Sequence, residues 1–130
     1  MKVNILIVDD EQELREVIGE ELVLEDFECH FAKSGNDALK FLFNKQSPEV
    51  DIILSDIRME DGNGIYLLEK LKEEKPDHPP LYFYSGYSEY DKVLTMAKGA
   101  QDHFAKPLKV DFLIEQFKKN HPALFNHKKD

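Results

Sequence analysis

The sequence is poor in cysteine, because Cys29 is the single one among 130 residues. One thiol cannot form a disulfide within the chain, nor can it build a zinc site that needs several cysteines. Long apolar runs are also absent, since no segment approaches the roughly 20 consecutive apolar residues of a membrane-spanning helix. Met1 and Lys2 lead directly into a strand-like run, unlike a secretion signal. We therefore expect a cytoplasmic chain with no membrane partner.

Basic residues are outnumbered as well, with 17 Lys and Arg against 26 Asp and Glu, for a formal net charge of -9. Nonspecific binding to nucleic acid depends mainly on neutralising phosphates with Lys and Arg, so we expect no nucleic-acid partner. The content of hydrophobic residues, 42%, is ordinary for a globular protein. A chain of this length is about one domain long.

The hydrophobic pattern alternates between strands and helices. Residues 3–8 and 50–54 form nearly unbroken apolar runs, which are typical of strands covered on both faces. Residues 81–84 look similar, and 28–32 and 102–104 are weaker strand candidates. The intervening and following segments have helical spacing of apolar residues: 14–22, 38–42, 65–71, 93–97 and 112–117. The order is five repeats of strand followed by helix.

Five alternating units of this kind favour a parallel sheet with helices on both faces. We predict an α/β fold, a flavodoxin-like, doubly wound (βα)5 sheet with strand order 2-1-3-4-5. The domain is expected to span residues 1–120, with 121–130 as a short C-terminal tail that leaves no room for a second domain. In such sheets ligands bind at the carboxyl ends of the strands.

Five polar residues follow the predicted strands: Asp9, Asp10, Asp56, Ser85 and Lys106. Carboxylates crowded at one rim repel one another by about 4 kcal/mol per pair at ~4 Å and an effective dielectric near 20. Mg²⁺ would offset this repulsion, because it prefers oxygen ligands and is commonly held by one or two carboxylates with phosphate oxygens. A carboxylate, an ammonium and a hydroxyl around such a cation suit phosphoryl transfer onto the carboxylate.

Four motifs in register resemble the receiver domains of bacterial response regulators, of the type found in the chemotaxis regulator. They are Val8-Asp9-Asp10, the segment from Ser55 to Met59 with Gly64 after it, Ser85-Gly86 and Lys106-Pro107. Each pair alone is common, but together they match in order and spacing over nearly the whole chain. The resemblance implies a stand-alone phosphorylation switch of a two-component system.

The resemblance also implies a role for each residue of the motifs. Asp56 would accept the phosphoryl group from a histidine kinase or a histidine phosphotransfer protein. Asp10, Asp56 and the backbone carbonyl of Arg58 would bind Mg²⁺ directly, while Asp9 would act mainly through water. Lys106 would contact the phosphoryl group, Ser85 would move toward it, and the peptide bond before Pro107 would be cis.

The sequence departs from the family pattern at several positions. Glu60 stands where the family often has proline, and Asn63 stands where it often has aspartate, which leaves the stiffness of this loop open. Ser85 replaces the commoner threonine but still provides a hydroxyl. His103 occupies the position of the usual switching Tyr or Phe, so it is either a switch residue sensitive to acidity or a surface residue on an edge strand.

Three functions remain open from the sequence. In the leading one, phosphorylation changes the face formed by residues 93–97, 102–104 and 112–117, and a downstream protein binds this face. Homodimerisation through the same face remains an alternative. The second is a Mg²⁺-dependent phosphohydrolase, against which Arg58 stands where a general acid would be needed. The third is an interaction module that needs no phosphorylation. We expect no turnover of a small substrate, although self-dephosphorylation would accompany the first function.

Overall fold

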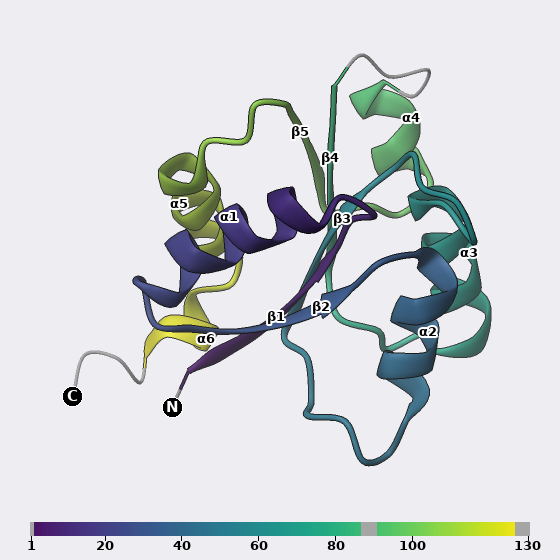
Figure 1. Ribbon diagram of the computed structural model, residues 1–130, viewed down its shortest axis with the longest axis horizontal. Coiled ribbons are helices and arrows are strands. Elements are labelled where there is room, and N and C mark those ends of the chain that lie inside the picture. The colour runs from purple at the N-terminus through teal and green to yellow at the C-terminus, as the bar shows by residue number, and fades with distance from the viewer. Residues whose placement is uncertain (1, 87–90, 127–130) are drawn as a thin grey trace.

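The computed structural model describes residues 2–86 and 91–126 and contains a five-stranded parallel sheet in the order β2-β1-β3-β4-β5 (Figure 1). The predicted fold class and strand order are confirmed. The strands are β1 Val3–Val8, β2 Phe27–Ala32, β3 Ile52–Asp56, β4 Leu81–Ser85 and β5 Asp102–Ala105. The helices are α1 Gln12–Val23, α2 Gly35–Phe43, α3 Gly64–Glu74, α4 Lys92–Ala97, α5 Val110–Asn120 and α6 Pro122–Phe125.

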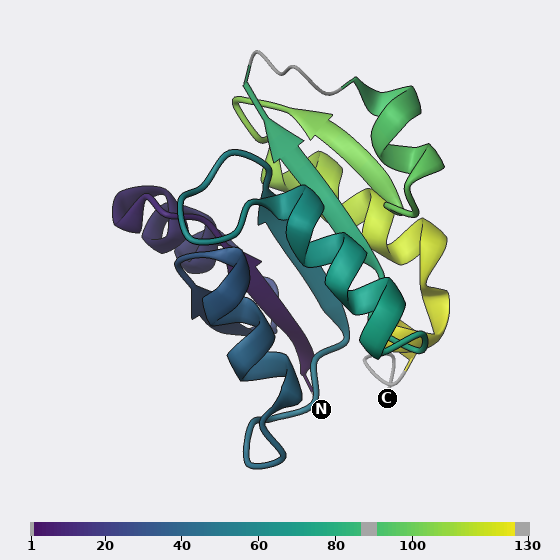
Figure 2. The same cartoon turned by 90° about the vertical axis from the view of Figure 1, so that its right-hand side faces the viewer.

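Helices cover both faces of the sheet, with α1 and α5 on one side and α2, α3 and α4 on the other (Figures 1 and 2). The side chains of β1 alternate between the two cores: Ile5 packs in the cluster that contains Leu113 of α5, and Leu6 in the cluster that contains Leu67 of α3. Because both faces are covered, the inner strands are apolar at nearly every position.

Several strand ends differ by one or two residues from the prediction. β3 begins at Ile52, and the carboxylate of Asp51 just before it accepts a hydrogen bond from the backbone N–H of Asn4 at 2.8 Å. Asp56 and Ser85 are therefore the last residues of β3 and β4 and do not lie beyond them. Both side chains still lie at the carboxyl edge of the sheet.

Residues 121–126, which the sequence pattern assigned to a tail, contain the short helix α6. Phe125 in this helix is buried, with its ring centroid 5.9 Å from that of Phe27. This part of the predicted tail is thus packed against the domain, because a large aromatic side chain gains more from burial than from exposure. Residues 127–130 of the predicted tail lie outside the described residues.

Helix α4 buries a polar side chain and exposes apolar ones. Thr95 is fully buried, whereas Val93 is 77% exposed and Leu94 and Met96 are also exposed. The apolar spacing that predicted this helix therefore does not mark its buried face. Within residues 2–86 and 91–126, no helix combines the length and apolar content needed to cross a bilayer.

Candidate functional site: an acidic pocket at the sheet edge

The carboxyl ends of β1, β3 and β4 and the segment after β5 meet around one pocket of about 370 Å³. Its lining consists of Asp10, Glu11, Asp56, Arg58, Ser85, Gly86 and Lys106. Parallel strands bring their carboxyl ends to the same edge, so residues up to 96 positions apart in sequence meet here. Five of the residues predicted for the site line this pocket, and Asp9 lies buried next to it.

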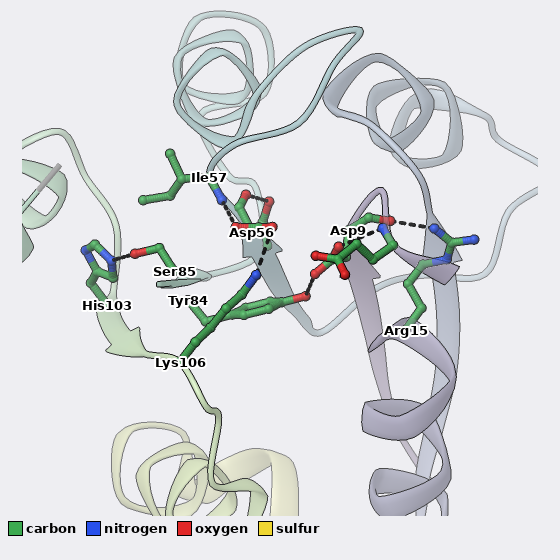
Figure 3. Close-up of polar contacts among 10 residues, drawn as sticks. Asp9, Arg15, Asp56, Ile57, Tyr84, Ser85, His103 and Lys106 are labelled. Atoms are coloured by element: carbon green, nitrogen blue, oxygen red, sulfur yellow. Dashed lines mark hydrogen bonds and ion pairs between the residues drawn. The ribbon is translucent and has the colours of Figure 1, made fainter. Parts of the chain in front are cut away.

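Asp56 is 6% exposed, and both of its carboxylate oxygens have partners (Figure 3). Its Oδ1 accepts a hydrogen bond from the backbone N–H of Ile57 at 2.7 Å, and the Nζ of Lys106 lies 3.2 Å from Oδ2. Burial raises the pKa of Asp56 above its ordinary value, and the charge of Asp9 adds to this effect. Lys106 and the N–H of Ile57 oppose the shift without cancelling it.

Asp9 is fully buried, and protein donors occupy its polar atoms. The backbone N–H of Glu11 donates to Oδ1 at 2.9 Å, and the hydroxyl of Tyr84 donates to Oδ2 at 2.5 Å (Figure 3). Arg15 donates to the backbone carbonyl at 2.6 Å. Asp9 is therefore held in place from inside the protein, whereas Asp10 is exposed and faces the pocket.

The donor set fits a hard divalent cation. Carboxylate oxygens of Asp9, Asp10 and Glu11 lie within 4.8 Å of one another, and Asp56 lines the same pocket. The lining residues include two cationic side chains, Lys106 and Arg58, against three carboxylates. Oxygen ligands of this kind suit Mg²⁺.

His103 on β5 bridges two hydroxyls. Its Nε2 lies 2.7 Å from Ser85 Oγ, and its Nδ1 lies 3.0 Å from Thr95 Oγ1. The Thr95 hydroxyl also lies 3.2 Å from the Lys92 carbonyl, to which it can donate. In the tautomer with the proton on Nδ1, that nitrogen donates to Thr95 and Nε2 accepts from Ser85. Burial, followed by the neighbouring Lys92, lowers the pKa of His103, while Asp102 and Asp91 oppose the shift.

The loop between β3 and α3 is anchored to the start of α2. Asp61, whose φ is 59°, accepts from the Ser34 hydroxyl at 3.1 Å and from the Asn36 amide at 2.9 Å. The N–H of Gly35 donates to the carbonyl of Gly62 at 2.7 Å, and Asn63 caps α3 by accepting from Tyr66 N–H. Side-chain and backbone bonds thus hold the loop in which Glu60 replaces the family's proline.

Two polar contributors were not predicted from the sequence. Tyr84 lies in the predicted strand 81–84, yet its hydroxyl bonds Asp9; its position directly before Ser85 is the available signal. Thr95 gave no signal, because a threonine inside a helix is ordinary.

The Lys106–Pro107 peptide bond is cis.

The family model of the response regulator receiver domain matches residues 5–118. The chain therefore belongs to this family, whose members are modules of two-component signalling and not turnover enzymes for small substrates. Among curated proteins, response regulator SaeR of Staphylococcus aureus strain USA300 is 30% identical over 125 residues, which cover 91% of this chain and 53% of SaeR. The chain spans about half the length of such relatives.

Solved structures agree with this assignment. Response regulator TrrA of Thermotoga maritima, in complex with Mg(2+)-BeF, is 34% identical with a TM-score of 0.78, covering 92% of this chain and 98% of TrrA. The CheX-CheY-BeF3-Mg+2 complex of Borrelia burgdorferi contains a chain that is 25% identical with a TM-score of 0.81, covering 91% of this chain and 88% of that one.

Proposed function

We propose that Asp56 is a phosphoacceptor and that its phosphorylation, supported by Mg²⁺, changes the binding of this chain to another protein. The observation that carries the proposal is the meeting of Asp56, Lys106 and Ser85 in one acidic pocket. A carboxylate nucleophile, an ammonium and a hydroxyl are the groups that phosphoryl transfer to a side chain requires. The match to receiver domains supports the same reading.

In this proposal Asp10, Asp56 and the backbone carbonyl of Arg58 would hold Mg²⁺ directly, and Asp9 would act through water. Bound Mg²⁺ would supply positive charge to the phosphoryl oxygens. TrrA, 34% identical, was solved with magnesium and a beryllium fluoride, which supports a similar ligand here.

The chain's own residues carry the rest of the reaction. An oxygen of Asp56 bonds to phosphorus as the bond to the donor's leaving atom breaks, so the phosphoryl group moves to the aspartate. Lys106, already 3.2 Å from Asp56, balances the charge that arrives. The N–H of Ile57 orients the carboxylate from the other side. Self-dephosphorylation would follow when water attacks the phosphorus, breaks the bond to the Asp56 oxygen and releases inorganic phosphate.

Ser85 would transmit the change, because its hydroxyl has one proton to donate. In the His103 tautomer with Nε2 unprotonated, the Ser85 hydroxyl donates to Nε2, and a phosphoryl oxygen on Asp56 would compete for that proton. Loss of that bond would release His103, which also contacts Thr95 of α4. The population of α4 positions would shift in consequence.

The α4–β5–α5 face would be the surface that a downstream protein reads. It carries exposed apolar side chains, among them Val93, Leu94 and Met96 on α4 and Phe112 on α5. Exposed apolar side chains in one region are typical of protein interfaces. A histidine kinase or phosphotransfer protein would supply the phosphoryl group in the cytoplasm, and a second copy of this chain is an alternative occupant of the face.

Incubation with acetyl phosphate and Mg²⁺ tests the acceptor. We expect a gain of one phosphoryl group by intact mass, and none in Asp56→Asn. Glu49→Gln, which removes an exposed carboxyl away from the pocket, should behave as wild type. If wild type showed no mass gain and did not bind magnesium beryllofluoride, the proposal would be contradicted. Rapid turnover of acetyl phosphate with no phosphorylated protein accumulating would favour a phosphohydrolase instead.

Thr95→Val tests the transmission step. Valine keeps the shape of the fully buried side chain but removes the hydroxyl that contacts His103. We expect magnesium beryllofluoride to bind as in wild type, while the change in hydrogen exchange that it causes in α4 becomes smaller. An unchanged response in α4 would remove Thr95 from the pathway.

A further inference from the structure

Tyr84 is not among the residues that line the acidic pocket, but it contacts Asp9 next to the pocket and Lys106 within it. Tyr84 is fully buried in β4, and its O–H donates to Oδ2 of Asp9 at 2.5 Å (Figure 3). The Nζ of Lys106 lies 5.3 Å from the centroid of the same ring. One aromatic side chain thus touches both an acidic residue and the lysine of the site.

The phenol stays protonated and acts as a donor. Burial and the negative charges of Asp9 and Asp56 raise the pKa of Tyr84 far above its ordinary value. A hydrogen bond to an ionised acceptor is stronger than one between neutral groups. The proton of Tyr84 therefore offsets part of the charge on the most deeply buried carboxylate.

A cation in the pocket would act on the same charge. Oxygens of Asp9 and Asp10 lie within 4.8 Å of each other, so a metal bound to Asp10 senses Asp9 directly or through one water. Two sources of positive charge that stabilise one carboxylate each reduce what the other gains. The phenol and the metal are then coupled through Asp9.

We propose that Tyr84 is a positioning residue that holds Asp9 in the metal-free pocket and thereby weakens Mg²⁺ binding. The proposal rests on the proposed function, because it takes Mg²⁺ as the ligand. Its hydroxyl compensates the negative charge of Asp9 when no cation is bound. The same bond lowers the affinity that three neighbouring carboxylates would otherwise have for the metal.

Tyr84→Phe tests this, because it removes the hydroxyl and keeps the ring beneath Lys106. Tyr82→Phe is the matched control: Tyr82 is also fully buried in β4, and its hydroxyl bonds His121 and Asn120 outside the pocket. Unfolding in chelator measures the metal-free protein, and calorimetric titration with MgCl₂ measures the affinity.

We expect both variants to be less stable than wild type without metal. The Kd for Mg²⁺ should fall about fivefold in Tyr84→Phe, at the low end of coupling between sites, and stay unchanged in Tyr82→Phe. In an Asp9→Asn background, where the acceptor charge is gone, Tyr84→Phe should no longer change the Kd.

An unchanged or weaker affinity in Tyr84→Phe would overturn the inference, as would an equal change in Tyr82→Phe or a change that persists with Asn at position 9. These outcomes leave the proposed function standing as long as wild type binds Mg²⁺. Failure of wild type to bind Mg²⁺ would instead overturn the proposed function, and the inference with it.

Discussion

Nε2 of His103 lies 2.7 Å from the hydroxyl of Ser85, so the residue at the family's aromatic switch position already contacts the residue expected to move toward the phosphoryl group. The histidine is half-buried and not simply a surface residue of an edge strand. Its second nitrogen contacts Thr95, which links the pocket to α4 through two hydrogen bonds.

The first prediction concerns acidity. Burial lowers the pKa of His103 in the folded chain, so the folded state binds fewer protons than the unfolded state just below the ordinary histidine pKa of about 6.5. The contribution of neutral His103 to stability is therefore fully present above about pH 6.5 and decreases as the pH falls below that value. The melting temperature in chelator should drop between pH 7.5 and about 5.5.

His103→Phe should make that drop smaller, because phenylalanine does not titrate. The pKa of His121 is lowered by burial as well, so its titration should account for part of the slope that remains. The double variant His103→Phe, His121→Phe should be the least sensitive to pH. A slope unchanged by either substitution would contradict the assignment.

The second prediction concerns the acceptor. The pKa of Asp56 is raised mainly by burial, so its ionised form costs stability at neutral pH. Asp56→Asn should increase the free energy of unfolding in chelator by about 1 kcal/mol, or roughly 3–5 °C in melting temperature. The gain should shrink as the pH falls below the raised pKa of Asp56 and vanish near an unfolded aspartate pKa of about 3.9.

Glu49→Gln provides the control for that measurement, since it removes one exposed negative charge. It should leave the melting temperature within the scatter of surface substitutions, about 0.5 kcal/mol. Mg²⁺ should stabilise wild type more than Asp56→Asn, because a ligand stabilises the state that it binds. Equal stabilisation of both proteins would count against Asp56 as a metal ligand.

The third prediction concerns the loop anchor at Asp61. Asp61→Asn keeps a residue that tolerates a positive φ but loses one acceptor oxygen, and Asp61→Ala loses both acceptors and the tolerance. Stability should therefore decrease from wild type to Asn to Ala. Mg²⁺ affinity should decrease in the same order if the anchor positions the Arg58 carbonyl, and calorimetry would show whether it does.

The bonds from Asn36 and Ser34 hold the pKa of Asp61 below its ordinary value. The contribution of Asp61 is thus present above the ordinary aspartate pKa and is lost as the pH falls toward its lowered pKa. The difference between wild type and Asp61→Ala should narrow at low pH. A difference that stays constant down to pH ~2 would mean that the anchor acts through backbone conformation alone.

The fourth prediction concerns helix α6. Phe125→Ala should lower the free energy of unfolding by about 3 kcal/mol, because it opens a cavity against Phe27. Phe43→Ala, at an exposed position, should cost much less. Denaturant unfolding measures both, and equal costs would show that residues 121–126 behave as a tail in solution.

The sequence by itself determined the order of strands and helices and the motifs Asp9-Asp10, Asp56, Ser85 and Lys106-Pro107. These signals are local: a strand covered on both faces must be apolar throughout, and residues at the ends of parallel strands must share one edge. Their positions on a common rim followed from topology alone, which is why the pocket could be expected from residues far apart in the chain.

Only the tertiary structure decided the contacts of Tyr84, Thr95 and Asp61, as well as the packing of Phe125. A hydrogen bond between residues 75 positions apart, such as that from Tyr84 to Asp9, depends on the register of strands and on rotamers, which no spacing rule encodes. Phe125 is likewise buried only because neighbouring elements pack around it. The sequence determines which side chains can form hydrogen bonds, and the packing of the elements determines which of them come close enough to do so.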